Sequence, residues 1–517
     1  MKRRTLVKGA AAAAVAAAFG GSAVPVLAAA PGDLKIAVAS TFTTMDPWDA
    51  NDTLSQNAVR CFYEGLFRLD KDMKLKNVLA LSYEASKDGL VYTVKLRQGV
   101  KFHDGEPFNA AAVKANFDRI TDPNQHLKRY TLYKNIAKTE AVDDYTVRFT
   151  LHEPFSAFIN QLGHPSAGMI APKTLAKGKK ECAFHPCGTG PFVFEEWRPT
   201  DYMKVKKNPN YWRKGYPKVD SITWIPVAEN STRAAMIQTG EAMIATAMPF
   251  EQISALKGKE GIEIVEVPSI IHRYMSINVR KKPFDNLKVR QAINYAINKE
   301  ALCKVAFNGY AVPAEGPLPR GIEYFEKLGP WPYNPAKARQ LLKEAGYPNG
   351  FTTTLWSAYN HTTAQKVIQF LQQQLAQVGI KAKVQALEAG MRTAQVESAQ
   401  DPDKAGVRLY YVGWSSSTGE PDWALRPLLA TESFPPHSFN TAYYSSPAVD
   451  KGIRDALNTT DPKQKEAFYH KVQEEIWKDA PWAFLVTEKL VYAQRKGVKG
   501  FYMMPDGGYD FDEVELQ

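Results

Sequence analysis

The stretch "FTTTLWSAYNHTTAQKVIQFLQQQLAQVGIKAKVQALE", residues 351–388, decides the fold class. Both of its ends alternate polar and apolar side chains as strands do, whereas its middle carries apolar side chains at spacings of three and four, as helices do. The helix ends at Gly379 and the chain passes directly into the second strand. This order predicts a βαβ crossover between parallel strands. Because ligands of open α/β sheets lie beyond the carboxyl ends of the strands, we expect residues 357–363 at a binding edge.

The same two patterns recur along the rest of the chain. Strand-like alternation occurs in "YTVKL" (92–96) and "YTVRFTL" (145–151). Helical spacing occurs in "NAAAVKANFDRI" (109–120), "LKVRQAINYAINKEALCKVAF" (287–307) and "PAKARQLLKEAG" (335–346). The mixture predicts an α/β architecture, and a length of 517 residues predicts two or three domains.

The first thirty residues are typical of an export signal. Lys2, Arg3, Arg4 and Lys8 precede an Ala-rich apolar run that ends in small residues. The arginine pair favours a twin-arginine signal, and a plain Sec signal is the alternative. No other window offers the roughly 18 to 20 apolar residues of a spanning helix. We therefore expect signal removal after residue 30, which lowers the net charge from +11 to +7, and a protein that works outside the cytoplasm.

A search for catalytic motifs finds none that is complete. In "GWSSSTGEPDW", residues 413–423, Gly413 and Ser415 are followed by Ser417, so the second glycine of G-x-S-x-G is missing. His152 and Glu153 precede Pro154, which excludes a zinc-binding helix of the H-E-x-x-H type. Lysines and acids are interleaved without a basic stripe, so nucleic acid is not an expected partner. We predict no enzyme, no cofactor and no metal.

The four cysteines divide into two pairs. Cys61 and Cys303 lie in apolar, helix-like stretches, where buried reduced thiols are expected. Cys182 and Cys187 are close in sequence, so a small local disulfide is plausible in an oxidising compartment, and two free thiols are the alternative.

Aromatic residues next to small polar ones mark a candidate pocket. Trp356, Tyr359, Trp414 and Trp423 lie at or near predicted strand ends. Apolar walls with a few placed hydrogen-bonding groups are typical of sites for small molecules, so a binding protein is the leading class.

Three long stretches resemble one family, the peptide and nickel group of periplasmic solute-binding proteins that serve ABC importers. They are "GTGPFVFEEWRPTDYMKVKKNPNYW" (188–212), "SINVRKKPFDNLKVRQAINYAINKEAL" (276–302) and "GVKFHDGEPFNAAAVKANFDRI" (99–120). Within the group the chain is most similar to the glutathione-binding members, in "FTTMDPWDANDTLSQNAV" (42–59), "HLKRYTLYKNIAKTEAV" (126–142), "RAAMIQTGEA" (233–242) and "GWSSSTGEPDWAL" (413–425).

The resemblance implies a two-lobed periplasmic-binding-protein fold of the class II, cluster C type, with an extra small domain. Lobe I would comprise residues 31–62, 187–276 and 487–517, the extra domain residues 63–186, and lobe II residues 277–486. Crossings near residues 274–279 and 484–490 would form a hinge about which the lobes close around the ligand. The expected protein is a monomer that delivers glutathione to the permease and ATPase subunits of an ABC importer in the inner membrane.

The serine-rich segment 413–423 is the first candidate for the pocket wall. In dipeptide-binding members of the family an aspartate of this loop pairs with the amino terminus of the peptide, and Ser417 stands at that position here. Hydroxyl groups both donate and accept, which suits the amine and carboxylate of a γ-glutamyl end. Ser415, Ser416 and Thr418 would complete this wall, whereas Asp422 is also a candidate helix N-cap.

The two carboxylates of glutathione call for cations, because charge-assisted hydrogen bonds to arginine are strong. Arg129 and Arg273 are the candidates, and a surface or structural ion pair is the alternative for each. The resemblance adds Thr43, Thr44, Tyr274, Tyr359, His361, Trp414 and Asp422 as lining residues. Rival cargoes are a dipeptide, an oligopeptide, haem or a metal chelate, and a secreted serine hydrolase is the distant rival.

Overall fold

The structure is a computed structural model that describes residues 32–399 and 401–517. The expected signal at residues 1–30 lies outside the described residues. None of the helices in the described ranges is long and apolar enough to cross a membrane.

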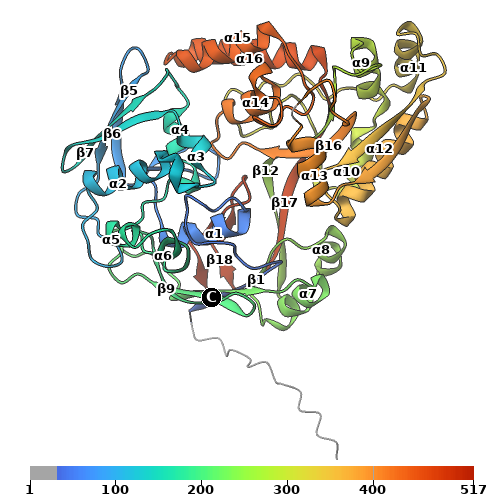
Figure 1. The fold of residues 1–517 in the computed structure, drawn as a ribbon. Coiled ribbons are helices and arrows are strands. Elements are labelled where there is room, and N and C mark those ends of the chain that lie inside the picture. The colour runs from blue at the N-terminus through green and yellow to red at the C-terminus, as the bar shows by residue number, and fades with distance from the viewer. Residues whose placement is uncertain (1–31, 400) are drawn as a thin grey trace, which may run out of the picture.

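One large mixed sheet runs through the molecule (Figure 1). Its strand order is β15-β14-β16-β12-β17-β11-β1-β10-β9-β8, and β13 pairs with β17 off this path. The strands are β1 Asp33–Val38, β8 Phe192–Arg198, β9 Tyr202–Lys207, β10 Ser221–Pro226, β11 Ile244–Ala245, β12 Ile262–Ile277, β13 Ala311–Pro313, β14 Phe351–Ser357, β15 Ile380–Ala386, β16 Leu409–Ser415 and β17 Trp482–Arg495.

The predicted βαβ unit is confirmed. Strands β14 and β15 pair in parallel from Phe351 with Ile380 to Ser357 with Ala386, and α12 (Thr362–Ala376) connects them. Helix α11 (Pro335–Glu344) forms where the apolar spacing predicts it, whereas the stretch 287–307 forms two helices, α9 (Leu287–Ala296) and α10 (Lys299–Phe307), because Asn298 caps the start of the second. They bury one hydrophobic core with β14, β15 and α12, and we call this part of the molecule the α12 half.

The other end of the large sheet, β1 with β8 to β11, is called here the β1 half. It adjoins a separate antiparallel sheet of order β4-β5-β7-β6, formed by β4 Ala80–Ala85, β5 Val91–Leu96, β6 Ile136–Asp143 and β7 Thr146–Leu151 and covered by α2 Ala110–Thr121. The strands predicted at 92–96 and 145–151 and the helix predicted at 109–120 are thereby confirmed. We call this unit the small sheet.

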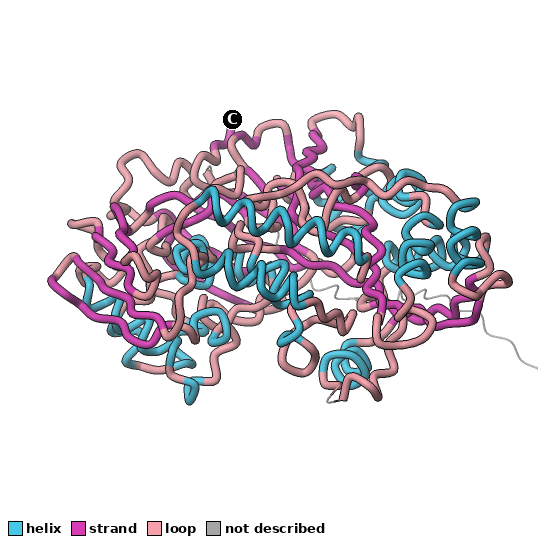
Figure 2. Tube along the Cα trace, turned by 90° about the horizontal axis from the view of Figure 1, so that it is seen from above, coloured by secondary structure: helices cyan, strands magenta, loops and turns pink. Residues whose placement is uncertain are grey.

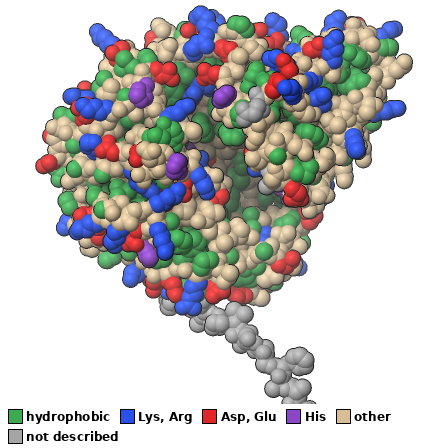
Figure 3. All heavy atoms as spheres, viewed as in Figure 1, with side chains coloured by type: hydrophobic (Ala, Val, Ile, Leu, Met, Phe, Trp, Pro, Cys, Tyr) green, Lys and Arg blue, Asp and Glu red, His purple; other side chains and the backbone are tan. Residues whose placement is uncertain are grey.

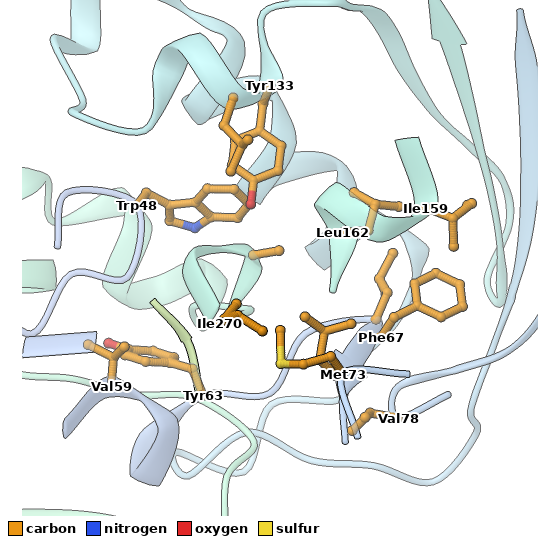
Figure 4. Close-up of a cluster of buried hydrophobic side chains, with 14 of the residues drawn as sticks. Trp48, Val59, Tyr63, Phe67, Met73, Val78, Tyr133, Ile159, Leu162 and Ile270 are labelled. Carbon is orange, nitrogen blue, oxygen red and sulfur yellow. The ribbon is translucent and has the colours of Figure 1, made fainter. Parts of the chain in front are cut away.

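A continuous core joins the small sheet to the β1 half. Figure 4 shows Trp48 beside Tyr133 of α3 (Tyr130–Tyr133), and Met73 among Phe67, Val78 and Ile270. The same core includes Tyr92 and Phe149 of the small sheet and Ile36 of β1. The small sheet is therefore fixed to the β1 half by apolar contacts rather than tethered by a linker.

The remaining helices cover the sheets and the top of the molecule. They are α1 Thr53–Phe62, α3 Tyr130–Tyr133, α4 Phe158–Leu162, α5 Pro172–Ala176, α6 Lys179–Phe184, α7 Asn230–Thr239, α8 Phe250–Leu256, α13 Ala389–Arg392, α14 Asp422–Leu429, α15 Pro447–Asn458 and α16 Pro462–Asp479. Short pairs complete the fold: β2 Phe67–Leu69 with β3 Leu75–Asn77, β18 Val498–Lys499 with β21 Glu515–Leu516, and β19 Tyr502–Met503 with β20 Tyr509–Asp510. Figure 2 shows two long helices across the upper face, which Figure 1 identifies as α15 and α16.

The antiparallel strands β12 and β17 connect the two halves of the sheet. Their register slips between Pro268 and His272 and again between Arg273 and Tyr274. In the first irregularity Ile270 donates its backbone N–H to Pro505 O at 3.0 Å instead of to β17. Such bulges bend a strand locally, so the sheet has its bend where the two halves meet.

The disulfide predicted between Cys182 and Cys187 is not formed, because all four cysteines are free. Cys182 lies in α6 with its Sγ directed at Thr174 O, 3.8 Å away, and belongs to the hydrophobic core. Cys61 and Cys303 are buried thiols, as expected.

We expect alkylation to find free thiols at Cys182 and Cys187 when the full chain is unfolded without a reductant. In the native protein at pH 8 the reaction should be slow, because burial raises the pKa of both thiols to about 11. Peptide mass mapping of the unreduced protein is the measurement, and a cross-linked peptide containing both cysteines would contradict this prediction.

Candidate functional site

A hollow opens on the face seen in Figure 3, and comparison with Figure 1 places it above α1 and in front of β12. The small sheet lies on one side of this hollow, and β16 with α13 lies on the other. The predicted site residues divide into a group on the α12 half and a group on the β1 half.

Arg273 is the centre of the first group. Its Nε lies 2.6 Å from Glu488 Oε1 on β17, and its guanidinium lies 4.8 Å from the ring centre of Tyr359. The Tyr359 hydroxyl accepts the backbone N–H of Gly413 at 3.2 Å, which ties the end of β14 to the start of the serine-rich segment. Arg273 therefore forms a structural ion pair, which was one of the two expectations for this residue.

His361 and Trp414 adjoin this group. The exposed His361 accepts the backbone N–H of Ala364 at its Nδ1, 3.3 Å away, and so caps α12. Burial and the charge of Arg273 lower the pKa of His361. The indole N–H of the half-buried Trp414 donates to Trp423 O at 2.7 Å. His361 is therefore held by the helix that it caps, whereas Trp414 on β16 is held by α14.

The serine loop, residues 415–420, carries four hydroxyl groups, and two of them form hydrogen bonds within the loop. Ser416 Oγ donates to Glu420 O at 2.8 Å, and Thr418 Oγ1 lies 3.4 Å from the N–H of Glu420. Ser417 is half-buried and its Oγ makes only a long contact of 3.5 Å with Ser415 O. The buried Ser415 Oγ has no hydrogen-bond partner among the described residues. Ser415 and Ser417 thus keep the hydroxyl capacity that a polar ligand would need.

The N-cap prediction for Asp422 is wrong. Pro421 occupies the cap position, and Asp422 is the first residue of α14. Its carboxylate binds Arg426 one turn later through two bonds of 2.7 and 2.8 Å, and it is 1% exposed. The Asp422 carboxylate is thus buried and paired within its own helix, and its role in ligand binding stays a prediction.

Tyr274 is also enclosed. Its ring stacks on Trp482 with centroids 3.8 Å apart, and the side chain is 2% exposed. It lines a small cavity beneath the serine loop together with Trp414 and Ser416. The structure therefore places Tyr274 behind the loop rather than in the open hollow.

The group on the β1 half contains Thr43, Thr44 and Arg129. The exposed Thr43 donates its hydroxyl to Asp52 Oδ2 at 2.6 Å, whereas the buried Thr44 accepts the N–H of Asp46 at 3.1 Å. Thr43 is available at the surface, and Thr44 stabilises the turn that follows it.

Arg129 is a partly buried cation. Its Nε donates to Ala50 O at 3.0 Å. Across residues 32–399 and 401–517 no carboxylate lies within ion-pair distance of it, and Asp52 acts on it only as a more distant charge. Burial lowers the pKa of Arg129. The neighbouring His164 is also buried, and its burial together with the charges of Arg129 and Arg60 lowers its pKa well below the usual value. Arg129 therefore offers a desolvated positive charge that an anionic group would compensate.

Sequence reasoning missed Glu488 and Glu420. Glu488 is the counter-ion of Arg273 but lies far along the chain, and only the pairing of β12 with β17 brings them together. Glu420 lies within the serine-rich segment 413–423, but no local signal indicates its buried ion pair with Lys465.

Comparisons with known proteins agree with this geometry. The sequence model of "Bacterial extracellular solute-binding proteins, family 5 Middle" matches residues 74–435. The chain is 60% identical over 516 residues to the glutathione-binding protein GsiB of Pectobacterium atrosepticum, covering 100% of this chain and 99% of the relative. It is 59% identical over 496 residues to GsiB of Salmonella typhi, covering 96% of each.

Solved structures are similar over almost the whole described length. HbpA2 from Haemophilus parasuis matches with a TM-score of 0.82 at 27% identity, covering 94% of this chain and 100% of that one. The periplasmic binding protein DppA from Helicobacter pylori, in complex with the peptide STSA, matches with a TM-score of 0.78 at 32% identity and covers 94% and 98%. The predicted two-lobed binding-protein fold is thereby confirmed.

Proposed function

We propose that this chain, which belongs to family 5 of the bacterial extracellular solute-binding proteins, captures glutathione and delivers it to an ABC importer. Membership makes it a binding component and not an enzyme, so the serine-hydrolase alternative is set aside. Its full-length similarity to proteins named as glutathione-binding carries the proposal. Among the described residues, the Ser415 hydroxyl has no hydrogen-bond partner, the half-buried Ser417 hydroxyl makes only a long contact, and Arg129 has no carboxylate within ion-pair distance. These groups support the proposal chemically.

In this proposal the α12 half is lobe II, and the β1 half is lobe I with the small sheet as its extra domain. The lobes close about the bend in β12 and β17, with boundaries near residues 63, 187, 277 and 487. Because a ligand shifts a closing equilibrium only by its differential affinity for the closed form, contacts from both halves are needed. The monomer then presents both lobes to the permease from the periplasm.

The test is a calorimetric titration of protein lacking residues 1–30 with reduced glutathione, oxidised glutathione and a panel of dipeptides. We expect saturable glutathione binding with a dissociation constant near or below micromolar, which corresponds to about −8 kcal/mol. If a dipeptide gives binding heat and neither form of glutathione does, the chain would still serve an importer, but glutathione would not be its ligand.

Ser417→Asp tests the loop as a specificity determinant. A carboxylate at this position would repel the glutathione carboxylates and attract a peptide amino terminus. We therefore expect at least tenfold weaker glutathione binding, about 1.4 kcal/mol, and new dipeptide binding. Ser417→Ala removes the hydroxyl without adding a charge and should weaken glutathione binding less than Ser417→Asp does, with no new dipeptide binding. Unchanged glutathione binding by the aspartate variant would show that the loop does not touch the ligand.

A further inference from the structure

The carboxylate of Glu420, at the base of the serine loop, is buried and fully used. Glu420 is 0% exposed, and its Oε1 lies 2.8 Å from Lys465 Nζ and 2.9 Å from the Tyr469 hydroxyl of α16. Its Oε2 accepts the N–H of Asp422 at 2.6 Å, where α14 begins. Burial and the Glu420 carboxylate raise the pKa of Tyr469 well above its usual value, so its hydroxyl keeps the proton that it donates. One side chain therefore ties the loop to two helices.

The tip of the same loop, Thr418 and Gly419, contacts residues outside α14 and α16. Thr418 O accepts a hydrogen bond of 3.3 Å from Asn160 Nδ2, next to the small sheet. Gly419 has a φ of +72°, and a Cβ added to it would lie 2.9 Å from Met73 O. Met73 belongs to the core shown in Figure 4, so the tip packs against a buried part of the molecule.

Together these contacts fix the position of the loop between α16 on one side and Asn160 and Met73 on the other. The anchor residues Glu420, Lys465 and Tyr469 lie within residues 277–486, the proposed lobe II, whereas Asn160 on α4 and Met73 lie within residues 63–186, the proposed extra domain. If the loop were displaced, it would lose either the contacts of its tip with Asn160 and Met73 or the orientation of the Ser415 and Ser417 hydroxyls.

We propose that Glu420 is a positioning residue for ligand capture. By fixing the position of the serine loop, Glu420 couples ligand binding to closure of the lobes. This positioning role rests on the proposed function of the loop, whereas the contacts by which Glu420 anchors the loop do not depend on that function. Glu420 does not touch the ligand and acts through Ser415, Ser417 and the loop tip.

The experiment compares Glu420→Gln with the double variant Glu420→Gln/Lys465→Met in the full chain lacking residues 1–30. The single variant leaves Lys465 as a buried cation without its counter-ion, so its melting temperature should fall. The double variant removes that cation and should melt close to the wild type. Because one amide oxygen cannot replace both carboxylate oxygens, glutathione binding should stay at least tenfold weaker in both variants, mainly through faster dissociation.

Two measurements separate positioning from general destabilisation. Hydrogen exchange of the amides at residues 417–422 should be faster in both variants, with or without ligand. The matched control is Glu64→Gln, which alters a carboxylate that accepts bonds from Thr189, Tyr211 and Trp212 at 2.7–2.9 Å, away from the loop. It should lower the melting temperature and leave the glutathione affinity within threefold.

The positioning role is overturned if the affinity recovers with the melting temperature in the double variant, if Glu64→Gln weakens binding as much as Glu420→Gln, or if loop exchange is unchanged. If the wild type binds no glutathione, the proposed cargo fails, and the same comparison is then made with the dipeptide that gives heat. If no tested compound binds, the exchange rates alone decide whether Glu420 holds the loop.

Discussion

Replacing Glu488 by alanine is expected to lower the free energy of unfolding by about 3 kcal/mol, because Arg273 would remain as a buried cation without its partner. The two side chains are only 15% and 17% exposed, and their 2.6 Å contact joins the bent strands β12 and β17. Urea unfolding followed by circular dichroism measures the loss.

The same strand pair supplies the control for this prediction. Lys489 Nζ and Glu266 Oε2 lie 3.2 Å apart on β17 and β12 but are 35% and 40% exposed. Glu266→Ala should therefore cost no more than about 0.5 kcal/mol. The double variant Arg273→Met/Glu488→Leu should recover most of the stability. A loss below 1 kcal/mol for Glu488→Ala would show that solvent already screens the Arg273 pair.

Replacing Arg129 by methionine is expected to weaken glutathione binding about 30-fold, roughly 2 kcal/mol, the size of a hydrogen bond to a charged group. The variant should not be less stable than the wild type, because Arg129 carries a desolvation cost and lacks a carboxylate partner among the described residues. Titration calorimetry and thermal unfolding of the same samples test both statements.

A modified ligand identifies the group that Arg129 would bind. If Arg129 binds the glycyl carboxylate, the glycyl ethyl ester of glutathione should lose affinity for the wild type but little more for Arg129→Met. The neighbouring exposed Lys128 is the matched control, and Lys128→Met should change affinity less than twofold. Equal losses on esterification in the wild type and the variant would exclude this contact.

The fold was largely predictable because its signals are local. The βαβ unit at 351–388 and the helices at 109–120 and 335–346 each carry their period and end signals within the segment. The pairing of β12 with β17 was not predictable from periodicity, because it joins residues more than two hundred positions apart. Only the resemblance indicated crossings near these strands.

Predictions about individual side chains were less successful where two local interactions compete. Asp422 has the residue type and position of an N-cap, but Arg426 one turn later satisfies its carboxylate better. Cys182 and Cys187 have a permissive spacing, yet α6 directs Cys182 into the core. For Arg129 and Arg273 the sequence left the ion-pair alternative open, and only the three-dimensional neighbours distinguish the two arginines.

The position of β17 has a consequence for biosynthesis. This strand lies between β12 and β11, so the large sheet cannot close before residue 495 has left the ribosome. Until then the growing chain exposes two unpaired strand edges, which are prone to aggregation. Folding must therefore be largely post-translational and slow, since its decisive contacts are distant in sequence.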